Sequence, residues 1–336
     1  MSDSQPTPEK VLSMMNAYQQ TAALYAAIEL DVFGALGKGC NDVPSISRHC
    51  GASERGIRIL CDFLSSHGLI EKSNGRYNHT PTSLVFLDPG SPMSMGSLAA
   101  FLNDSAVNNV YRNLAEVVRT GRTTLPGTGT IEPENPLWVT FAKSMVPMMG
   151  PIAVPLSNLV LGELSGPIRV LDVAAGHGLF GIEIAKQNPS AQITALDWNQ
   201  VLDVASENAR IAGVDDRYTR LPGSAFDVEF GGLYDAVLLT NFLHHFDKPT
   251  CVTLLKKVHR ALRPGGIVAT LEFVPDESRT RPLAATGFAM TMLTSTEAGD
   301  AYTLAELSAM YQEAGFGTVA AHPIPMSPQT VILGKA

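Results

Sequence analysis

A glycine-rich turn in the second half of the chain offers the clearest chemistry. Residues 170–181, VLDVAAGHGLFG, have the pattern of a strand, a tight turn and the start of a helix. Gly176 and Gly178 would let the backbone approach a ligand where any Cβ atom would collide with it. The spacing also fits the G-x-G-x-x-G pattern of nicotinamide-binding domains, and a turn needed only for packing is the plainer alternative.

Two carboxylates near this turn narrow the choice of ligand. Asp172 lies four residues before Gly176, where a carboxylate would repel a pyrophosphate but can pair, directly or through water, with a cation. Asp197 ends the next expected strand, where an acid accepts hydrogen bonds from the two hydroxyls of a ribose. S-adenosylmethionine has both a ribose and a cationic methionine end, so the two acids favour it over a nicotinamide cofactor.

Two adjacent histidines follow a strand that is expected at 234–240. They belong to residues 241–246, NFLHHF, at the carboxyl edge of the sheet, where ligands bind in open α/β folds. Adjacent side chains cannot both point the same way, so we expect one of His244 and His245 to face the site and the other the surface. A neutral imidazole, with an unperturbed pKa of about 6.5, can take a phenolic proton at pH 7. A helix-capping or buried structural histidine is the alternative.

Several apolar side chains suit a flat organic substrate. Methionine adapts its shape and packs well against rings, so a cluster of methionines and aromatics predicts an apolar substrate with few charges. Ordinary core packing explains any single one of them equally well. The candidate substrate-binding residues are Trp138, Phe141, Met145, Met149, Phe242 and Met290.

The elements that hold these residues belong to the α/β class. From residue 167 onward, apolar strand-like runs alternate with helical patterns, which indicates a doubly wound, Rossmann-like domain with a largely parallel sheet. The expected strands cover 168–174, 192–197, 217–222, 234–240, 266–273, 318–324 and 329–334. The expected helices cover 178–187, 199–212, 249–262 and 303–314. A short turn between the last two strands predicts a C-terminal hairpin, which places an antiparallel strand in the sheet.

Residues 8–100 have the pattern of an all-helical domain with one hairpin. Apolar residues from Met14 to Val32 recur at helical spacing, and Ser53 is the expected N-cap of a later helix. Asn74-Gly75 predicts a tight hairpin turn. Helix, helix and hairpin together form a winged-helix pattern.

Charge and composition limit the partners and the compartment. The helix after Ser53 balances its two arginines with two acids, and the net charge of the chain is −8, so no nucleic-acid partner is expected. No apolar run reaches the roughly 18 residues of a membrane span, and no signal segment begins the chain, so we expect no membrane and a cytoplasmic location. The four cysteines form no Cys-x-x-Cys pair, so no metal is expected.

Residues 168–336 resemble class I S-adenosylmethionine-dependent methyltransferases. With the winged-helix front half, the whole chain resembles the small-molecule O-methyltransferase family of caffeate-type plant enzymes and bacterial phenazine and polyketide tailoring enzymes. The glycine turn and the two acids carry the likeness to the class, while the domain pairing and Leu243-His244 point to the family. The resemblance implies S-adenosylmethionine as cofactor, a small-molecule substrate and a homodimer. It also implies a dimerisation domain over 1–100, a helical connector over 101–166 that contributes to the substrate pocket, and a catalytic domain over 167–336.

The resemblance also implies a set of cofactor-binding residues. Ser224 stands where the family usually has an aspartate that binds the adenine amine, and Trp198 would lie beside the adenine, although a core position at the sheet edge explains it equally well. Phe226 would pack on the adenine. The implied cofactor-binding residues are Asp172, Gly176, Gly178, Asp197, Trp198, Ser224, Phe226 and Asn241.

The catalytic set that the resemblance implies is only partly present. His244 takes the position of the base that accepts the substrate proton, and Glu272 matches one of two glutamates that orient it. The second glutamate position is Ala301, and the aspartate that follows the base in the family is His245 here. Carbon or sulfur methylation without a base therefore stays open. So does a DNA-binding regulator that senses S-adenosylmethionine.

Overall fold

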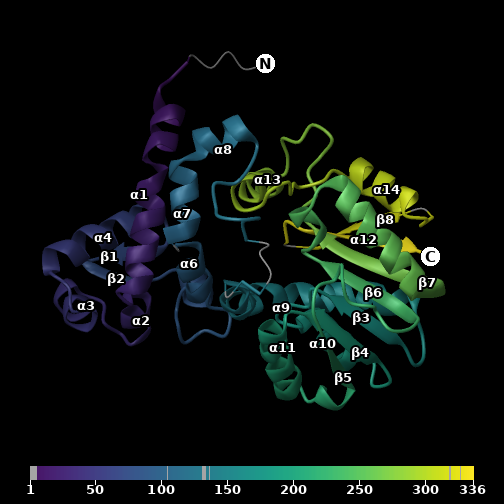
Figure 1. The fold of residues 1–336 in the computed structure, drawn as a ribbon. Helices are drawn as coiled ribbons and strands as arrows, with labels where there is room; N and C mark the ends of the chain where they lie inside the picture. Colours follow the sequence, from purple (N-terminus) through teal and green to yellow (C-terminus); the bar gives the residue numbers. More distant parts are fainter. Residues whose placement is uncertain (1–5, 104, 131–133, 136, 318, 326) are drawn as a thin grey trace. The chain divides into compact units, whose positions relative to one another are not determined.

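The computed structural model describes residues 6–103, 105–130, 134–135, 137–317, 319–325 and 327–336. The chain forms two compact units, 1–103 and 104–336 (Figure 1). The division of roles among 1–100, 101–166 and 167–336 stays a prediction, because the contacts that define the two units do not separate a connector from the second unit.

The first unit is a small helical domain with a two-stranded hairpin. Its elements are α1 (Glu9–Glu29), α2 (Val32–Gly37), α3 (Val43–Cys50), α4 (Glu54–Ser66), β1 (Ile70–Ser73), β2 (Arg76–His79), α5 (Pro81–Phe86) and α6 (Gly96–Leu102). Ser53 caps α4 as expected, since its side chain accepts from the backbone of Gly56. Asn74 and Gly75 form the hairpin turn with φ angles of 49° and 76°, as the Asn-Gly pair predicted.

The first helix is shorter than its apolar pattern predicted. It ends at Glu29, because Asp31 adopts a left-handed conformation (φ 57°) and Val32 starts α2. The N-terminal half of α1 leaves large apolar side chains in solvent, with exposed fractions of 75% for Met14 and 66% for Tyr18.

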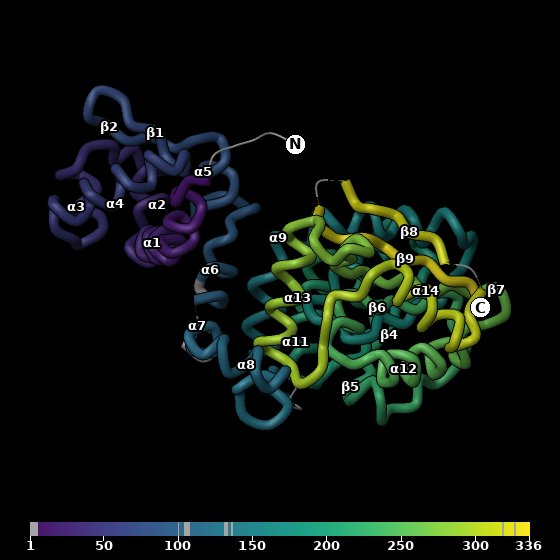
Figure 2. Tube along the Cα trace, turned by 90° about the horizontal axis from the view of Figure 1, so that it is seen from above, coloured from purple at the N-terminus to yellow at the C-terminus, as the bar shows by residue number. Residues whose placement is uncertain are grey.

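The second unit contains a seven-stranded sheet of order β5-β4-β3-β6-β7-β9-β8. The strands are β3 (Arg169–Val173), β4 (Gln192–Asp197), β5 (Tyr218–Pro222), β6 (Tyr234–Thr240), β7 (Leu262–Glu272), β8 (Val319–Pro323) and β9 (Thr330–Lys335). β3 to β7 are parallel, while β9 runs antiparallel to β7 and β8. Figure 2 shows β8 and β9 side by side. The doubly wound α/β fold, with its antiparallel C-terminal hairpin, is therefore confirmed.

Helices cover both faces of this sheet (Figure 1). α9, α10 and α11 pack together on one face, and α12 and α14 pack together on the other. The helices of this unit are α7 (Ser105–Arg112), α8 (Leu114–Thr120), α9 (Leu137–Glu163), α10 (Leu179–Gln187), α11 (Asn199–Ile211), α12 (Lys248–Ala261), α13 (Leu283–Ser295) and α14 (Leu304–Glu313). Two 3-10 turns, η1 (Asp215–Arg217) and η2 (Leu243–His245), complete it.

The long helix α9 is apolar enough, by length and composition alone, to cross a membrane. This differs from the expectation that no segment would pass such a test. α9 contains Pro147, Pro151 and Pro155, and it packs against α10 and α11 with Met149 and Leu156 buried. These contacts are those of a core helix in a folded domain.

Candidate active site

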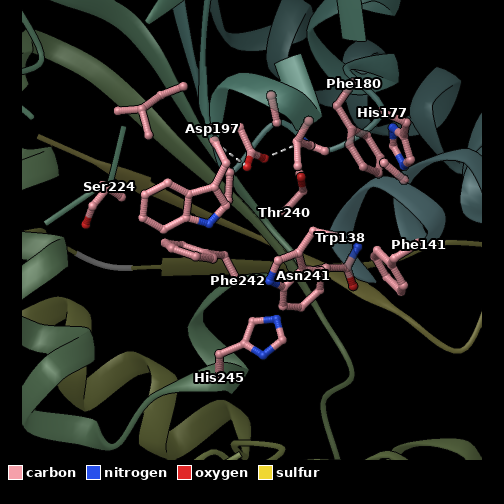
Figure 3. A pocket seen from close by; sticks show the side chains of 18 of the residues that line it. Trp138, Phe141, His177, Phe180, Asp197, Ser224, Thr240, Asn241, Phe242 and His245 are labelled. Carbon is pink, nitrogen blue, oxygen red and sulfur yellow. Dashed lines mark hydrogen bonds between the residues drawn. The ribbon is translucent and has the colours of Figure 1, made fainter. Parts of the chain in front are cut away.

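One cavity of about 260 Å³ lies at the carboxyl edge of β3, β4 and β6 (Figure 3). The start of α9, the glycine turn and the loops after β4, β5 and β6 form its walls. The cavity brings together eleven of the predicted site residues, namely Trp138, Phe141, Met145, Met149, Gly176, Asp197, Trp198, Ser224, Phe226, Asn241 and Phe242. Asp172, Gly178, His244, Glu272 and Met290 are not among the residues that line it.

The two glycines of the turn have different surroundings. Gly176 (φ 57°) lines the cavity, and a Cβ atom there would meet nothing closer than the Ala174 carbonyl oxygen at 3.9 Å. At Gly178 (φ 77°) a Cβ atom would lie 2.5 Å from the Tyr218 hydroxyl and 3.0 Å from the Ala205 Cβ. Gly176 therefore leaves room for a ligand, whereas Gly178 is required for the packing of α10 against α11 and β5.

Asp197 faces the cavity from the end of β4. One carboxylate oxygen accepts from the Gly176 N–H at 2.8 Å and the other from the Trp198 N–H at 2.7 Å. Burial raises the pKa of Asp197 to about 6, while these two backbone hydrogen bonds lower it. Each carboxylate oxygen can accept more than one hydrogen bond, so Asp197 fits the role of acceptor for a pair of ribose hydroxyls.

Asp172 lies beneath the turn and is fully buried. Its Oδ2 accepts from the Gly181 N–H at 3.2 Å, and Oδ1 has no hydrogen-bond partner among the described residues. Burial raises the pKa of Asp172 to about 8, and the Gly181 hydrogen bond lowers it. Asp172 is not among the residues that line the cavity, so direct contact with a bound cation does not fit this position.

The side of the cavity near β5 carries the residues expected around an adenine. Trp198 follows Asp197, and the Ser224 hydroxyl accepts from the Phe226 N–H at 3.1 Å. The Phe226 ring lies 5.0 Å from the Phe246 ring, centroid to centroid. Aromatic faces and a hydroxyl suit a flat heterocycle with hydrogen-bonding edges.

His244 contacts Glu272 and is not among the residues that line the cavity. Its Nδ1 lies 2.5 Å from Glu272 Oε2, and only 4% of the residue is exposed. The other Glu272 oxygen accepts from the N–H groups of Phe242 at 3.2 Å and Leu243 at 3.0 Å. Glu272 thus fixes both the His244 ring and the turn that carries it.

His245 borders the cavity. The sequence alone did not decide which of the two adjacent histidines would do so. The His245 ring lies 5.5 Å from Trp138 and 6.4 Å from Phe242, and its buried Nδ1 has no partner among the described residues. Burial, with a smaller effect of His244, lowers the pKa of His245 well below 6.5. We expected one of the two histidines to face the surface, and neither does.

The structure also adds residues that the sequence had not singled out. His177 and Phe180 line the cavity on the side of α10, and Thr240 lines it at the end of β6. His177 stands between the two glycines of the motif, and that position was the signal that could have identified it. Met290, on α13, is 39% exposed and is not among the residues that line the cavity. Among the described residues, no group of three or more His, Cys, Asp or Glu side chains could hold a metal ion.

Comparisons with known proteins agree with this architecture. Family models match an O-methyltransferase domain over residues 145–317 and an O-methyltransferase dimerisation domain over residues 12–89. A naphthoate enzyme of Streptomyces sahachiroi, 3-hydroxy-5-methyl-1-naphthoate 3-O-methyltransferase, is 29% identical over 93% of this chain and 90% of its own length.

Solved structures extend the likeness to the whole fold. A Nostoc punctiforme protein assigned as an O-methyltransferase is 43% identical, with a TM-score of 0.95 over 99% of this chain and 100% of its own. Human N-acetylserotonin methyltransferase, solved in complex with S-adenosylmethionine, has a TM-score of 0.82 at 22% identity over 100% of this chain and 99% of its own. The chain therefore belongs to the O-methyltransferase family and combines that family's dimerisation and O-methyltransferase domains.

Proposed function

We propose that this protein transfers the methyl group of S-adenosylmethionine to a hydroxyl group of a small, flat, mostly apolar metabolite. The proposal rests on one observation: Gly176, Asp197 and Trp198 line the same cavity. There a ribose can bind the Asp197 carboxylate, and the glycine turn leaves space for the chain that extends from it. When bound, S-adenosylmethionine supplies a methyl group on a positively charged sulfur, which an oxygen nucleophile can attack.

The substrate class follows from the apolar wall that α9 and the loop after β6 present. Trp138, Phe141, Met145, Met149 and Phe242 line this wall, and a flat ring can pack between such side chains. The relative from Streptomyces sahachiroi acts, by its name, on a hydroxynaphthoate. A hydroxylated aromatic ring is therefore the acceptor that we propose here.

We propose His244 as the base, with Glu272 as the residue that orients it. Because Nδ1 donates to the Glu272 carboxylate, Nε2 is left as the proton acceptor. The substrate hydroxyl would pass its proton to Nε2 as its oxygen forms the bond to the methyl carbon. His245 is the alternative base, because it borders the cavity with an unpartnered Nδ1.

Calorimetric titration of the protein tests the cofactor assignment. S-adenosylhomocysteine should bind, and NAD and random duplex DNA should not. Asp197→Ala should weaken the binding of S-adenosylhomocysteine strongly, because hydrogen bonds to a charged acceptor contribute about 1.5–3 kcal/mol each. Binding of NAD without S-adenosylhomocysteine would replace the proposal with an oxidoreductase. Tight binding of DNA without methyl transfer would favour a regulator that senses S-adenosylmethionine.

We also propose a homodimer that forms through residues 8–100 and acts in the cytoplasm. The match to a dimerisation domain over residues 12–89 supports the dimer. The exposed apolar side chains of α1 support it too, because isolated proteins seldom leave such a row in water. The four free cysteines suit a reducing compartment.

A further inference from the structure

His177 is a buried side chain that points to a specific ligand group. It stands between Gly176 and Gly178, lines the cavity and is only 6% exposed. The Asn208 side chain donates to its carbonyl oxygen at 2.8 Å, which fixes the backbone of the turn at this residue.

The hydrogen bonds of the ring define which nitrogen carries the proton. Nδ1 accepts from the Leu179 N–H at 3.1 Å, so the proton of the neutral ring must be on Nε2. Burial lowers the pKa of His177 to about 4, which keeps the ring neutral. Within the described part of the chain, Nε2 has no acceptor, so His177 offers the cavity one N–H donor on a rigid turn.

The position of His177 matches the methionine end of the cofactor. In Figure 3, His177 and Phe180 lie on one side of Asp197, and Ser224 lies on the other. If the ribose binds Asp197 and the adenine extends toward Ser224, the methionine extends toward His177. This side also holds the start of α10, where the helix dipole favours a negative charge.

The methionine carboxylate would otherwise lack a strong partner. Among the described residues, no lysine or arginine lines the cavity. The Asn241 side chain is already engaged, since its carbonyl oxygen accepts from Gln329 and its amide contacts the Met149 sulfur. We propose that the Nε2–H of His177 donates a hydrogen bond to the methionine carboxylate of the cofactor, with the start of α10 adding to the attraction. This proposal rests on the proposed function.

Three adenosine ligands separate this role from a structural one. S-adenosylhomocysteine carries the carboxylate, its decarboxylated analogue keeps the amino group alone, and methylthioadenosine lacks both. His177→Asn keeps an acceptor for the Leu179 N–H but removes the outer donor. His177→Gln can return an N–H farther from the backbone. Calorimetry should show that His177→Asn binds S-adenosylhomocysteine about 10- to 100-fold more weakly, the effect of losing one hydrogen bond to a charged group.

The same variant should bind the other two ligands within about twofold of the parent protein, and His177→Gln should recover part of the loss. An equal loss for all three ligands would mean that His177 only shapes the turn, and unchanged binding of S-adenosylhomocysteine would also overturn the proposal. Failure of the parent protein to bind S-adenosylhomocysteine would instead overturn the proposed function, and this proposal with it. Thermal unfolding of each variant checks that it folds.

Discussion

His244 and His245 are neighbours in the sequence but have different surroundings. His244 is hydrogen-bonded to Glu272, and His245 borders the cavity. If His244 is the base, His244→Ala should lower the methyl-transfer step by roughly 10²–10⁴-fold, while cofactor affinity changes little. Glu272→Gln should lower the rate of the same step almost as much. Ala301 stands where the family has a second glutamate, so Glu272 is the remaining one of the two that would orient His244. Single-turnover rates measure both effects.

His245→Ala is the matched variant for this test. A small effect of His245→Ala beside a large one of His244→Ala would support the assignment of His244. The reverse order would move the base to His245. Near-normal rates in both variants would mean that the acceptor needs no base, and carbon or sulfur methylation would become the better account.

Asp172 gives the protein a pH-dependent stability of its own. Its pKa is about 8 in the fold and about 3.9 in an unfolded chain, so between these values the folded state holds the extra proton. The free energy of unfolding should therefore fall as the pH rises from 4 toward 8. Asp172→Asn does not titrate and should flatten this slope in the cofactor-free protein. Melting temperatures at pH 5 and pH 8 measure it, with the exposed Asp215→Asn as control. Parallel pH profiles for the parent and Asp172→Asn would contradict the prediction.

The glycine turn links the cavity to the packing of α10 behind it. Gly178→Ala would place a methyl group against the Tyr218 hydroxyl in a left-handed backbone position. Gly213 has a similar φ of 67° but open space around it, so Gly213→Ala carries the backbone strain alone. We expect Gly178→Ala to lower the free energy of unfolding by at least about 1 kcal/mol more than Gly213→Ala, the cost of overpacking. Urea denaturation compares them, and equal losses would show that α10 adjusts to the added methyl.

The regular elements of the second unit were predictable because their patterns are local. Strands such as β3, β4 and β6 are short, mostly apolar runs, and their bounds agree closely with the prediction. β7 begins at Leu262, before the expected start at residue 266, because the polar and glycine-rich residues at its beginning have no strand pattern. The end of α1 was not predicted, because the apolar spacing continues across Asp31 while the backbone turns left-handed there. α13 was not among the expected helices. Its sequence is apolar all around, so it gives no helical stripe.

The sequence predicted which residues form most of the candidate site, but not which way their side chains face. The sequence places Asp197, Gly176 and Trp198 at strand ends, and the topology then brings them to one edge. The hydrogen bond between His244 and Glu272 decides which of the two adjacent histidines faces the cavity. It joins residues that are 28 positions apart in the sequence. The tautomer of His177 depends likewise on a backbone N–H that no spacing rule predicts.

The exposed apolar face of α1 predicts that two copies of the protein associate. Val11, Met14, Met15 and Tyr18 are each more than half exposed. We expect a homodimer at micromolar concentration, and Met15→Glu should weaken it by placing a charge in an apolar interface. Gln20→Glu adds the same charge at an exposed polar position of the same helix and should have a smaller effect. Light scattering measures both, and a parent protein that is monomeric at this concentration would contradict the dimer.

The proposed reaction is methyl transfer from S-adenosylmethionine to an aromatic hydroxyl. The most direct measurement incubates the protein with carbon-13 methyl-labelled S-adenosylmethionine and a panel of hydroxylated aromatic acids that includes 3-hydroxy-5-methyl-1-naphthoate. Carbon-13 NMR of the products then shows which atom carries the label. We expect an aryl methyl ether that the Asp197→Ala variant does not form. A label on carbon or sulfur, or no labelled product from a protein that binds S-adenosylhomocysteine, would contradict this expectation.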